Sequence, residues 1–397
     1  MNTGSRYINL NNRFSGCNYD INEINTFCPE DHSPLEAQYD VSQKLDKSIL
    51  KDRAFDMWRY REMLPIKDDD HIFSLSEGGT PILDLSSLAK SYQIGRLQVK
   101  DETFNPTGSF KARGLGMAVS KGYELGIREF CIPTAGNAGS ALAAFCAASG
   151  SKAHIFMPRE TPTLFQVDCK IMGADLHIID GNISDCGKAM REANQDGKWF
   201  DVTTLKEPFR LEGKKTMGYE IAEQSDWHVP DVIIYPTGGG TGLIGIWKAF
   251  EEMHNLGWID RPRTRMVAVQ SDGCDPIVKA FEANLDQSKP YQNPSVTIAN
   301  GLRVPHAFGH KLILETLKES NGCALSVSDQ DMSEAMFELA TKEGLFVSPE
   351  GAATWHAAKI LRSNDWIKSN DNVLLLNTGS GYKYVENIQD DVLAQPG

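Results

Sequence analysis

Lys111, in the stretch "NPTGSFKARG", is the residue whose setting first suggests chemistry. It follows Phe110 at the start of an expected helix, after a turn at Pro106 and Gly108, and Ser109 is expected to cap that helix. An amine near the positive end of a helix dipole and beside apolar side chains is expected to have a lowered pKa, which allows it to attack an aldehyde. The alternative is an ordinary lysine on a solvated face.

A second loop of small residues joins the apolar run at 129–133 to an expected helix at 139–150. It consists of Thr134, Ala135, Gly136, Asn137 and Ala138. Backbone N–H groups at the start of a helix attract an anion such as a carboxylate. The amide of Asn137 could bond a ring hydroxyl. The alternative is a plain turn between a strand and a helix.

A third loop, in "YPTGGGTGLIGIW", contains Gly238, Gly239, Gly240, Thr241 and Gly242. Its backbone N–H groups follow one another with almost no side chains between them, which is typical of a nest that binds phosphate at a helix start. Three consecutive glycines between a strand and a helix are costly without a ligand, so a merely flexible turn is the weaker interpretation.

The same loop also matches G-x-G-x-x-G at Gly240, Gly242 and Gly245, and Asp272 follows the next apolar run. This pattern is the fingerprint of dinucleotide binding and would indicate an NAD-dependent oxidoreductase. The fingerprint normally follows the first strand of its unit, whereas here it comes after the middle of the chain. This alternative therefore remains open but is less favoured.

A fourth loop places Thr378 between an apolar run and a Gly-Ser-Gly turn, where its hydroxyl could bond a heterocyclic nitrogen. Taken alone, it is equally consistent with a tight turn. One ligand uses all four loops, because it needs a nucleophilic lysine, a phosphate cradle, an amide for a ring oxygen and a hydroxyl for a ring nitrogen. That ligand is pyridoxal phosphate.

Strands and helices alternate along the chain in a pattern that would place these loops together. Short apolar runs predict strands at 96–100, 129–133, 153–158, 174–180, 231–236, 265–270 and 372–379. Helical stretches between them, such as 139–150 and 243–257, predict an α/β fold with mostly parallel sheets. Ligands of such sheets bind beyond the carboxyl ends of the strands, where the four loops are expected to lie. A helix is also expected within 48–64.

The composition narrows the class of partner. The 397 residues carry 40 Lys and Arg against 53 Asp and Glu, a net charge of -13, which disfavours nucleic acid and anionic membranes. No run of 18 apolar residues and no signal peptide is recognised, so a cytoplasmic protein is expected. The eight cysteines are scattered singly, and no cysteine or histidine spacing typical of a metal site occurs, so no metal is expected.

Seven motifs, in this order, resemble those of the fold-type II (tryptophan synthase β-like) pyridoxal-phosphate enzymes. They are "GGTPIL", "NPTGSFKARG", "AGNAGSALAAF", "FRLEGKKTMGYEIAEQ", "PDVIIYPTGGGTG", "EGLFVSPEGAAT" and "NTGSGYK". Within this family the chain looks most like its threonine synthase-like members, mainly because of "RLEGKKT". The resemblance implies two open, mostly parallel α/β domains with the cofactor in the cleft between them.

The resemblance also implies domain boundaries. They are an N-terminal extension at 1–72, a large cofactor-binding domain at 73–114 and 216–390, a smaller α/β domain at 115–215, and a tail at 391–397.

The resemblance implies a role for each matching residue. Lys111 would form the Schiff base with the cofactor and act as the catalytic residue, and Phe110 would adjoin the cofactor. Asn137 would bond the ring hydroxyl and Thr378 the pyridine nitrogen. The cofactor phosphate would be bound by Gly238, Gly239, Gly240, Thr241 and Gly242. The substrate would be bound by Thr134, Ala135, Gly136, Ala138, Lys206 and Arg210, with Arg210 on its phosphate.

The implied reaction is that of a lyase in amino-acid biosynthesis, which converts O-phospho-L-homoserine and water to L-threonine and phosphate. The partner would be a small amino-acid substrate, and the enzyme a possible homodimer. Leu205 and Ala138 offer no hydrogen-bonding side chain near the expected substrate phosphate. Elimination or replacement at the β carbon of serine, threonine or phosphoserine, as in a dehydratase or a cysteate synthase, therefore remains the chief alternative.

Overall fold

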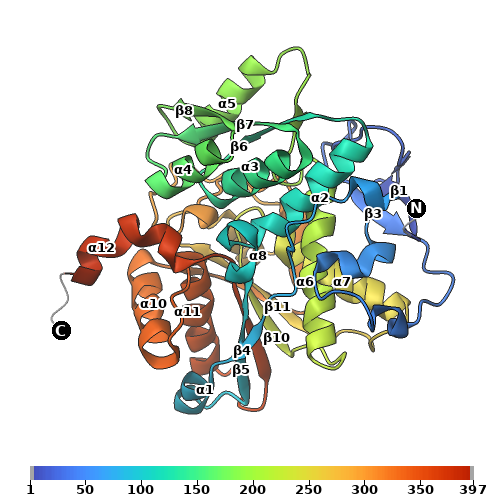
Figure 1. Cartoon of the computed structure of the whole chain (residues 1–397). Coiled ribbons are helices and arrows are strands. Elements are labelled where there is room, and N and C mark those ends of the chain that lie inside the picture. Colours follow the sequence, from blue (N-terminus) through green and yellow to red (C-terminus); the bar gives the residue numbers. More distant parts are fainter. Residues whose placement is uncertain (1–3, 394–397) are drawn as a thin grey trace. The chain divides into compact units, whose positions relative to one another are not determined.

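A computed structural model describes residues 4–393 of the chain (Figure 1). Their contacts divide the chain into two compact units. Unit 1 comprises Met1–Gly79, Asn105–Glu220 and Lys248–Asp260, and unit 2 comprises Thr80–Phe104, Ile221–Trp247 and Arg261–Gly397. The domain boundaries expected from the sequence remain a prediction. Within the described part of the chain, every helix is too short or too polar to cross a lipid bilayer.

Unit 2 is built on a six-stranded sheet in which five strands are parallel. In spatial order they are β12 (Cys323–Val327), β11 (Arg265–Ser271), β10 (Val232–Pro236), β13 (Asn372–Asn377), β5 (Arg96–Asp101) and the antiparallel β4 (Ile82–Asp84). The inner strands β10 and β13 are almost continuously apolar and buried, as expected for a parallel sheet covered on both faces.

Helices and short 3-10 turns complete unit 2. They are α1 (Ser86–Tyr92), η4 (Glu102–Phe104), α8 (Pro276–Glu282), η6 (Asn300–Leu302), α9 (His310–Glu319), α10 (Asp329–Glu343), α11 (Pro349–Ser363), η7 (Gly381–Tyr384) and α12 (Val385–Leu393). Helix α11 packs on β10, β11, β12 and β13, with α10 beside it. The buried Trp355 on α11 belongs to the core between these layers.

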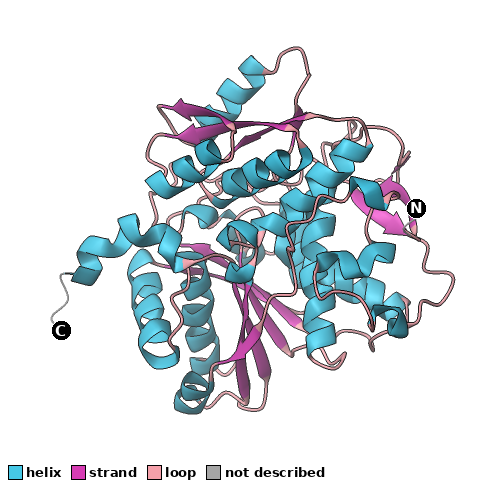
Figure 2. Cartoon of the chain, in the orientation of Figure 1, coloured by secondary structure: helices cyan, strands magenta, loops and turns pink. Residues whose placement is uncertain are grey.

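Unit 1 contains a four-stranded parallel sheet and a small antiparallel one (Figure 2). The parallel sheet has the order β8 (Asp175–Ile179), β7 (Lys152–Pro158), β6 (Glu129–Pro133) and β9 (Phe200–Asp201). The small sheet has the order β2 (Asn18–Tyr19), β1 (Tyr7–Asn11) and β3 (Glu36–Tyr39). Helix α5 covers one face of the parallel sheet, and α3 with α4 covers the other (Figure 1).

Helical segments also contribute to unit 1. They are η1 (Lys47–Leu50), η2 (Met57–Met63), η3 (Asp69–His71), η5 (Pro106–Gly108), α2 (Lys111–Glu124), α3 (Asn137–Ser149), α4 (Thr163–Ile171), α5 (Ile183–Ala193), α6 (Phe209–Gln224) and α7 (Thr241–Asn255). Helices α6 and α7 each have residues in both units.

The expected α/β fold is confirmed, with a strand at each of the seven sites and helices at α3 and α7. Three expectations differ in detail. The segment 48–64 forms the 3-10 turns η1 and η2, because Asp46 and Asp56 each cap a short turn instead of starting a long helix. Strand β12 was not recognised from the sequence. The expected tail at 391–397 overlaps α12, and residues 394–397 lie outside the described residues.

Helices α2 and α6 of unit 1 cross at very short range. A Cβ atom added at Gly213 of α6 would lie 2.1 Å from the carbonyl oxygen of Arg113 on α2. Beside this crossing, both terminal nitrogens of the buried Arg113 guanidinium donate to the Glu220 carboxylate, one of them at 2.8 Å. Lys111 lies only two positions before Arg113 on α2, so this crossing helps to position its backbone.

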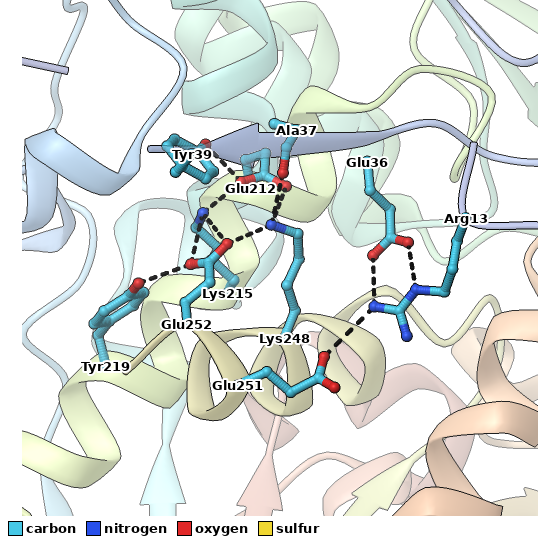
Figure 3. Close-up of polar contacts among 10 residues, drawn as sticks. All are labelled: Arg13, Glu36, Ala37, Tyr39, Glu212, Lys215, Tyr219, Lys248, Glu251 and Glu252. Atoms are coloured by element: carbon cyan, nitrogen blue, oxygen red, sulfur yellow. Dashed lines mark hydrogen bonds and ion pairs between the residues drawn. The ribbon is translucent and has the colours of Figure 1, made fainter. Parts of the chain in front are cut away.

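A buried network of charges also anchors the N-terminal strand β3 (Figure 3). The Tyr39 hydroxyl donates to Glu212 at 2.7 Å, and Lys215 bridges Glu212 and Glu252 at 2.5 and 3.0 Å. Lys248 contacts both carboxylates and donates to the carbonyl of Ala37 at 2.8 Å. Each charge removed from water thus has an opposite partner, which is the condition for tolerating buried ions.

The α2–α6 crossing gives a direct stability test. We expect Gly213→Ala to lower the free energy of unfolding by about 1–3 kcal/mol or more, because the added methyl group would overlap backbone atoms. Gly187→Ala in α5 is the matched control, since its added Cβ would have ordinary contacts from 3.4 Å. That change is expected to be neutral or slightly stabilising, because alanine favours helices over glycine. Urea unfolding of both variants measures the difference, and equal midpoints would contradict the geometry.

Candidate active site

Lys111 is the first residue of α2, as the sequence predicts. Its Nζ lies 4.1 Å from the centroid of the Phe110 ring, so the amine has an aromatic neighbour. The expected cap by Ser109 is wrong, because Phe110 takes the N-cap position and no side chain in the described part of the chain accepts a hydrogen bond from the first turn of α2. Among the described residues, the buried Ser109 hydroxyl has no hydrogen-bond partner.

The second loop leads from β6 into α3, which begins at Asn137. Gly136 has φ of 155° and ψ of -124°, and its N–H donates to the Thr134 hydroxyl at 3.3 Å. Helix α3 contacts both α2 and η5, the turn that precedes Lys111. The loop and the lysine therefore belong to neighbouring elements of unit 1.

Lys206 and Arg210 follow strand β9 in the chain, at the end of the sheet where the loop after β6 also begins. Strand β9 pairs in parallel with β6, so the chain after Asp201 and the loop after β6 leave the sheet at the same end. Arg210 is 1% exposed and donates through Nη1 to the carbonyl of Val202. Its buried Nε has no hydrogen-bond partner in the described structure. Lys206 lies 3.7 Å from the Asp201 carboxylate.

Glu207 caps the start of α6. Its carboxylate accepts from the N–H groups of Phe209 at 2.7 Å and Arg210 at 3.1 Å. Burial raises the pKa of Glu207 to about 7, although the Arg210 cation and these N–H groups oppose the shift. At neutral pH this carboxyl is therefore only partly ionised, and its charge offsets the nearby cations incompletely.

Lys214 lies on the same face of α6 as Arg210, one turn further along. Its Nζ is 4.6 Å from the centroid of the Phe110 ring, which also neighbours Lys111. Its Cε packs against Gly114 of α2, at 3.0 Å from where a Cβ would stand. Burial lowers the pKa of Lys214 well below its usual range. The cations of Lys111 and Arg210 lower it further, while Glu207 acts against them.

The glycine loop belongs to unit 2 and joins β10 to α7. A Cβ at Gly238 would lie 2.1 Å from the carbonyl oxygen of Gly301, and one at Gly242 would lie 2.0 Å from the Tyr235 hydroxyl. Gly240 has φ of 75°. The path therefore excludes side chains, and the N–H groups at the start of α7 are the polar groups that this loop presents.

Thr378 also belongs to unit 2 and directly follows β13, next to the glycine loop's strand β10 in the sheet. It is 7% exposed. The preceding Asn377 donates to Asp101 at 2.9 Å, and Ser348 N–H donates to the carbonyl of Gly379 at 3.1 Å. Both neighbours of Thr378 are therefore fixed, and its hydroxyl lies at the carboxyl edge of the sheet, the edge that binds ligands in such folds.

Each unit thus gathers part of the predicted site. Unit 1 holds the lysine, the small-residue loop and the cations on α6, while unit 2 holds the glycine loop and Thr378. The individual roles of these residues remain predictions.

Comparison with known proteins identifies the family. Residues 73–379 match the family model described as "Pyridoxal-phosphate dependent enzyme". The chain belongs to this family. Its cofactor is therefore pyridoxal phosphate, as the loops predict, and the alternative of an NAD-dependent oxidoreductase is wrong. The glycines of that alternative match, Gly240 to Gly245, lie at the start of α7.

Curated relatives share most of the chain. A threonine synthase from Methanocaldococcus jannaschii is 36% identical over 372 residues, which are 93% of this chain and 91% of the relative. A threonine synthase from Methanosarcina acetivorans is 33% identical, over 94% of this chain and 92% of the relative. The expected resemblance to threonine synthase-like members of the family is confirmed.

Solved structures support the fold. Maize serine racemase has a TM-score of 0.66 at 21% identity and covers 80% of this chain, with 93% of its own chain aligned. A threonine deaminase isoform from Solanum lycopersicum has a TM-score of 0.66 at 18% identity, over 80% and 88% of the two chains.

The residues present fit pyridoxal phosphate. The glycine loop offers backbone N–H groups for a phosphate where no side chain can stand, and an amine starts α2 beside an aromatic ring. Lys214 was missed at the sequence level, because "RLEGKKT" reads as a solvated, charged stretch. The one signal that could have found it is its spacing, since residues four apart on a helix share a face.

We expect Lys214→Gln to slow the modification of Lys111 by an amine-reactive reagent. Removing a neighbouring positive charge favours the unreactive ammonium form of Lys111. The measurement is the labelling rate of the Lys111 peptide between pH 6 and 9, on protein freed of pyridoxal phosphate. Lys188→Gln, on the exposed face of α5, is the control. An unchanged profile in Lys214→Gln would show that the two amines do not interact.

Proposed function

We propose that this enzyme converts O-phospho-L-homoserine and water to L-threonine and phosphate. The observation that carries the proposal is the charge of the cluster formed by Lys111, Arg210, Lys214 and Glu207 in unit 1. Two of its three cations are fully buried, and its one carboxyl has a pKa of about 7. A buried cation is costly unless an anion or hydrogen bonds compensate it, and a phosphate dianion would compensate Arg210. Curated relatives named threonine synthase support L-threonine as the product.

Residues of unit 1 would bind the substrate. Arg210, whose Nε has no partner among the described residues, would donate to the phosphate of the substrate. Lys206 would add a second positive charge. The substrate carboxylate would bind the N–H groups at the start of α3, in the loop from Thr134 to Ala138.

Several loops would contribute groups that bind the cofactor. Asn137 would bond its ring hydroxyl and Thr378 its pyridine nitrogen, while the loop Gly238–Gly242 would bind its phosphate. When bound, pyridoxal phosphate supplies the electron sink for chemistry at the α carbon. Phe110 would adjoin it.

Lys111 would hold the cofactor aldehyde and then, freed by the substrate's amino group, act as an acid and a base. It would take the proton from the α carbon of the substrate and carry protons between the α and β carbons. A buried cationic neighbour suits this work, because it keeps an amine partly neutral near physiological pH, where proton transfer is most efficient. The hydroxyl of the product comes from water, and the leaving group is phosphate.

The alternative is elimination or replacement at the β carbon of serine, threonine or phosphoserine. Leu205 is buried with φ of 60° and offers no donor, and Ala138 lacks a hydroxyl, so the phosphate has fewer donors than it could have. The buried Arg210, with its unpartnered Nε among the described residues, favours a phosphorylated substrate over serine and threonine.

The experiment compares substrates directly. We expect phosphate and threonine to form from O-phospho-L-homoserine, with kcat/KM at least tenfold above that for ammonia release from threonine or serine. Arg210→Gln is expected to lower kcat/KM for the phosphorylated substrate about 10–100-fold, the value of a charge-assisted hydrogen bond of roughly 1.5–3 kcal/mol, with little effect on an unphosphorylated one. Equal losses on both would contradict the role of Arg210, and ammonia release alone would contradict the reaction.

The remaining parts of the proposal are a small amino-acid substrate, a homodimer and a cytoplasmic location. They rest on the resemblance and on the acidic composition of the chain. Light scattering of the purified protein tests the homodimer.

A further inference from the structure

A second cluster of chemically active side chains lies on the parallel sheet of unit 1. His154 on β7 pairs in register with Asp175 on the edge strand β8, and His177 follows two residues along the same strand. Residues two apart on a strand face the same side, so all three side chains project from one face. His154 Nδ1 and His177 Nε2 each lie 3.1 Å from the same oxygen, Oδ2 of Asp175.

The three ligand atoms are spaced as a small metal ion requires. All lie within 4.8 Å of one another. In tetrahedral zinc sites, bonds of about 2.0–2.1 Å to nitrogen and oxygen place neighbouring ligand atoms about 3.3 Å apart. The observed spacing therefore needs only a small adjustment to surround an ion. Nitrogen and carboxylate ligands in this combination are typical of zinc and similar ions.

The surroundings hold both imidazole rings in place. His154 stacks on Trp199 with ring centroids 3.8 Å apart, and His177 stacks on Phe156 at 4.4 Å, each with an interplanar angle of 11°. The other nitrogen of His154, Nε2, lies 3.0 Å from Glu129 of β6. In metal sites a ligating histidine almost always donates its second N–H to a carboxylate, a backbone carbonyl or water, which fixes its tautomer.

We propose that His154, Asp175 and His177 form a binding site for one divalent transition ion of the zinc type. The ion would bind His154 through Nδ1, His177 through Nε2 and Asp175 through a carboxylate oxygen. Asp175 and His177 are partly exposed, so an ion can enter and water can complete the coordination. The site would tie the edge strand β8 to β7.

The sequence analysis predicts no metal site, because 21 positions separate His154 from Asp175 along the chain. Only the register between β7 and β8 brings His154 to Asp175. The proposal is independent of the reaction, since these side chains belong to the face of the sheet that is covered by α5, and it would stand if another substrate were found.

Titration of Zn²⁺ into the holoenzyme tests the proposal by calorimetry. We expect one equivalent to bind and the thermal midpoint to rise. His177→Ala is expected to abolish binding of this equivalent without loss of fold, because His177 is partly exposed. Glu129→Gln is expected to weaken binding about 10–100-fold, the usual effect of losing the carboxylate behind a ligating histidine. The d–d spectrum of bound Co²⁺ reports the ligands, and a thiolate charge-transfer band is not expected.

Two controls make the result specific. His306→Ala removes a histidine from another close pair, His306 and His310, which lies in unit 2. Cys17→Ser removes a partly exposed thiol, a competing ligand for the metal. Both variants are expected to keep the equivalent. The proposal is overturned if Zn²⁺ does not bind, or if His177→Ala binds it as well as the unchanged protein does. A thiolate band on Co²⁺ that disappears in Cys17→Ser would also overturn it.

Discussion

The burial of charge on α6 is the constraint on which the rest of unit 1 depends. This helix carries five charged side chains that are almost completely hidden from water: Arg210, Glu212, Lys214, Lys215 and Glu220. Removing an ion from water costs several kcal/mol unless an opposite charge or well-placed hydrogen bonds compensate. The helix can therefore fold in this position only if several other segments bring partners to it.

Those partners come from segments that are far apart in the sequence. Glu220 forms an ion pair with Arg113 of α2, and Glu212 accepts a hydrogen bond from the Tyr39 hydroxyl of β3. Lys215 forms an ion pair with Glu252 of α7, as Figure 3 shows. One helix thus fixes the N-terminal strand and the helix that begins at the proposed cofactor lysine. The N-terminal residues, which look like a separate extension in the sequence, are part of this arrangement.

Lys214 is buried on α6 close to two other basic side chains. Its neighbours Lys111 and Arg210 repel it, and Glu207 compensates only in part. Under the proposed function, the phosphate of the substrate would balance this positive charge. The helix that stabilises unit 1 through Arg113 would then also take part in binding that phosphate.

Much of the fold follows from local patterns in the sequence. The apolar runs identify strands such as β10 and β13, because a strand buried on both faces must be apolar throughout. Turn residues in the sequence predict that Lys111 lies at the start of a helix. They also predict the glycine loop before α7. Strand β12 could not be recognised, because its residues are only half buried and its pattern is weak.

Features that depend on tertiary contacts could not be predicted. The charges of α6 look solvated in the sequence, and only packing reveals that they are hidden. The cap assigned to Ser109 failed because Phe110 adopts the N-cap position. The cluster of His154, Asp175 and His177 depends on strand register, which a single sequence does not fix.

Reduction of the holoenzyme with borohydride tests the central claim, that Lys111 at the start of α2 is the residue that holds pyridoxal phosphate. Digestion and mass spectrometry then locate the reduced, labelled lysine. The account predicts a single label on the peptide that contains Lys111, and none in Lys111→Ala. A label on Lys214 in the unchanged protein, or a label that persists in Lys111→Ala, would contradict it.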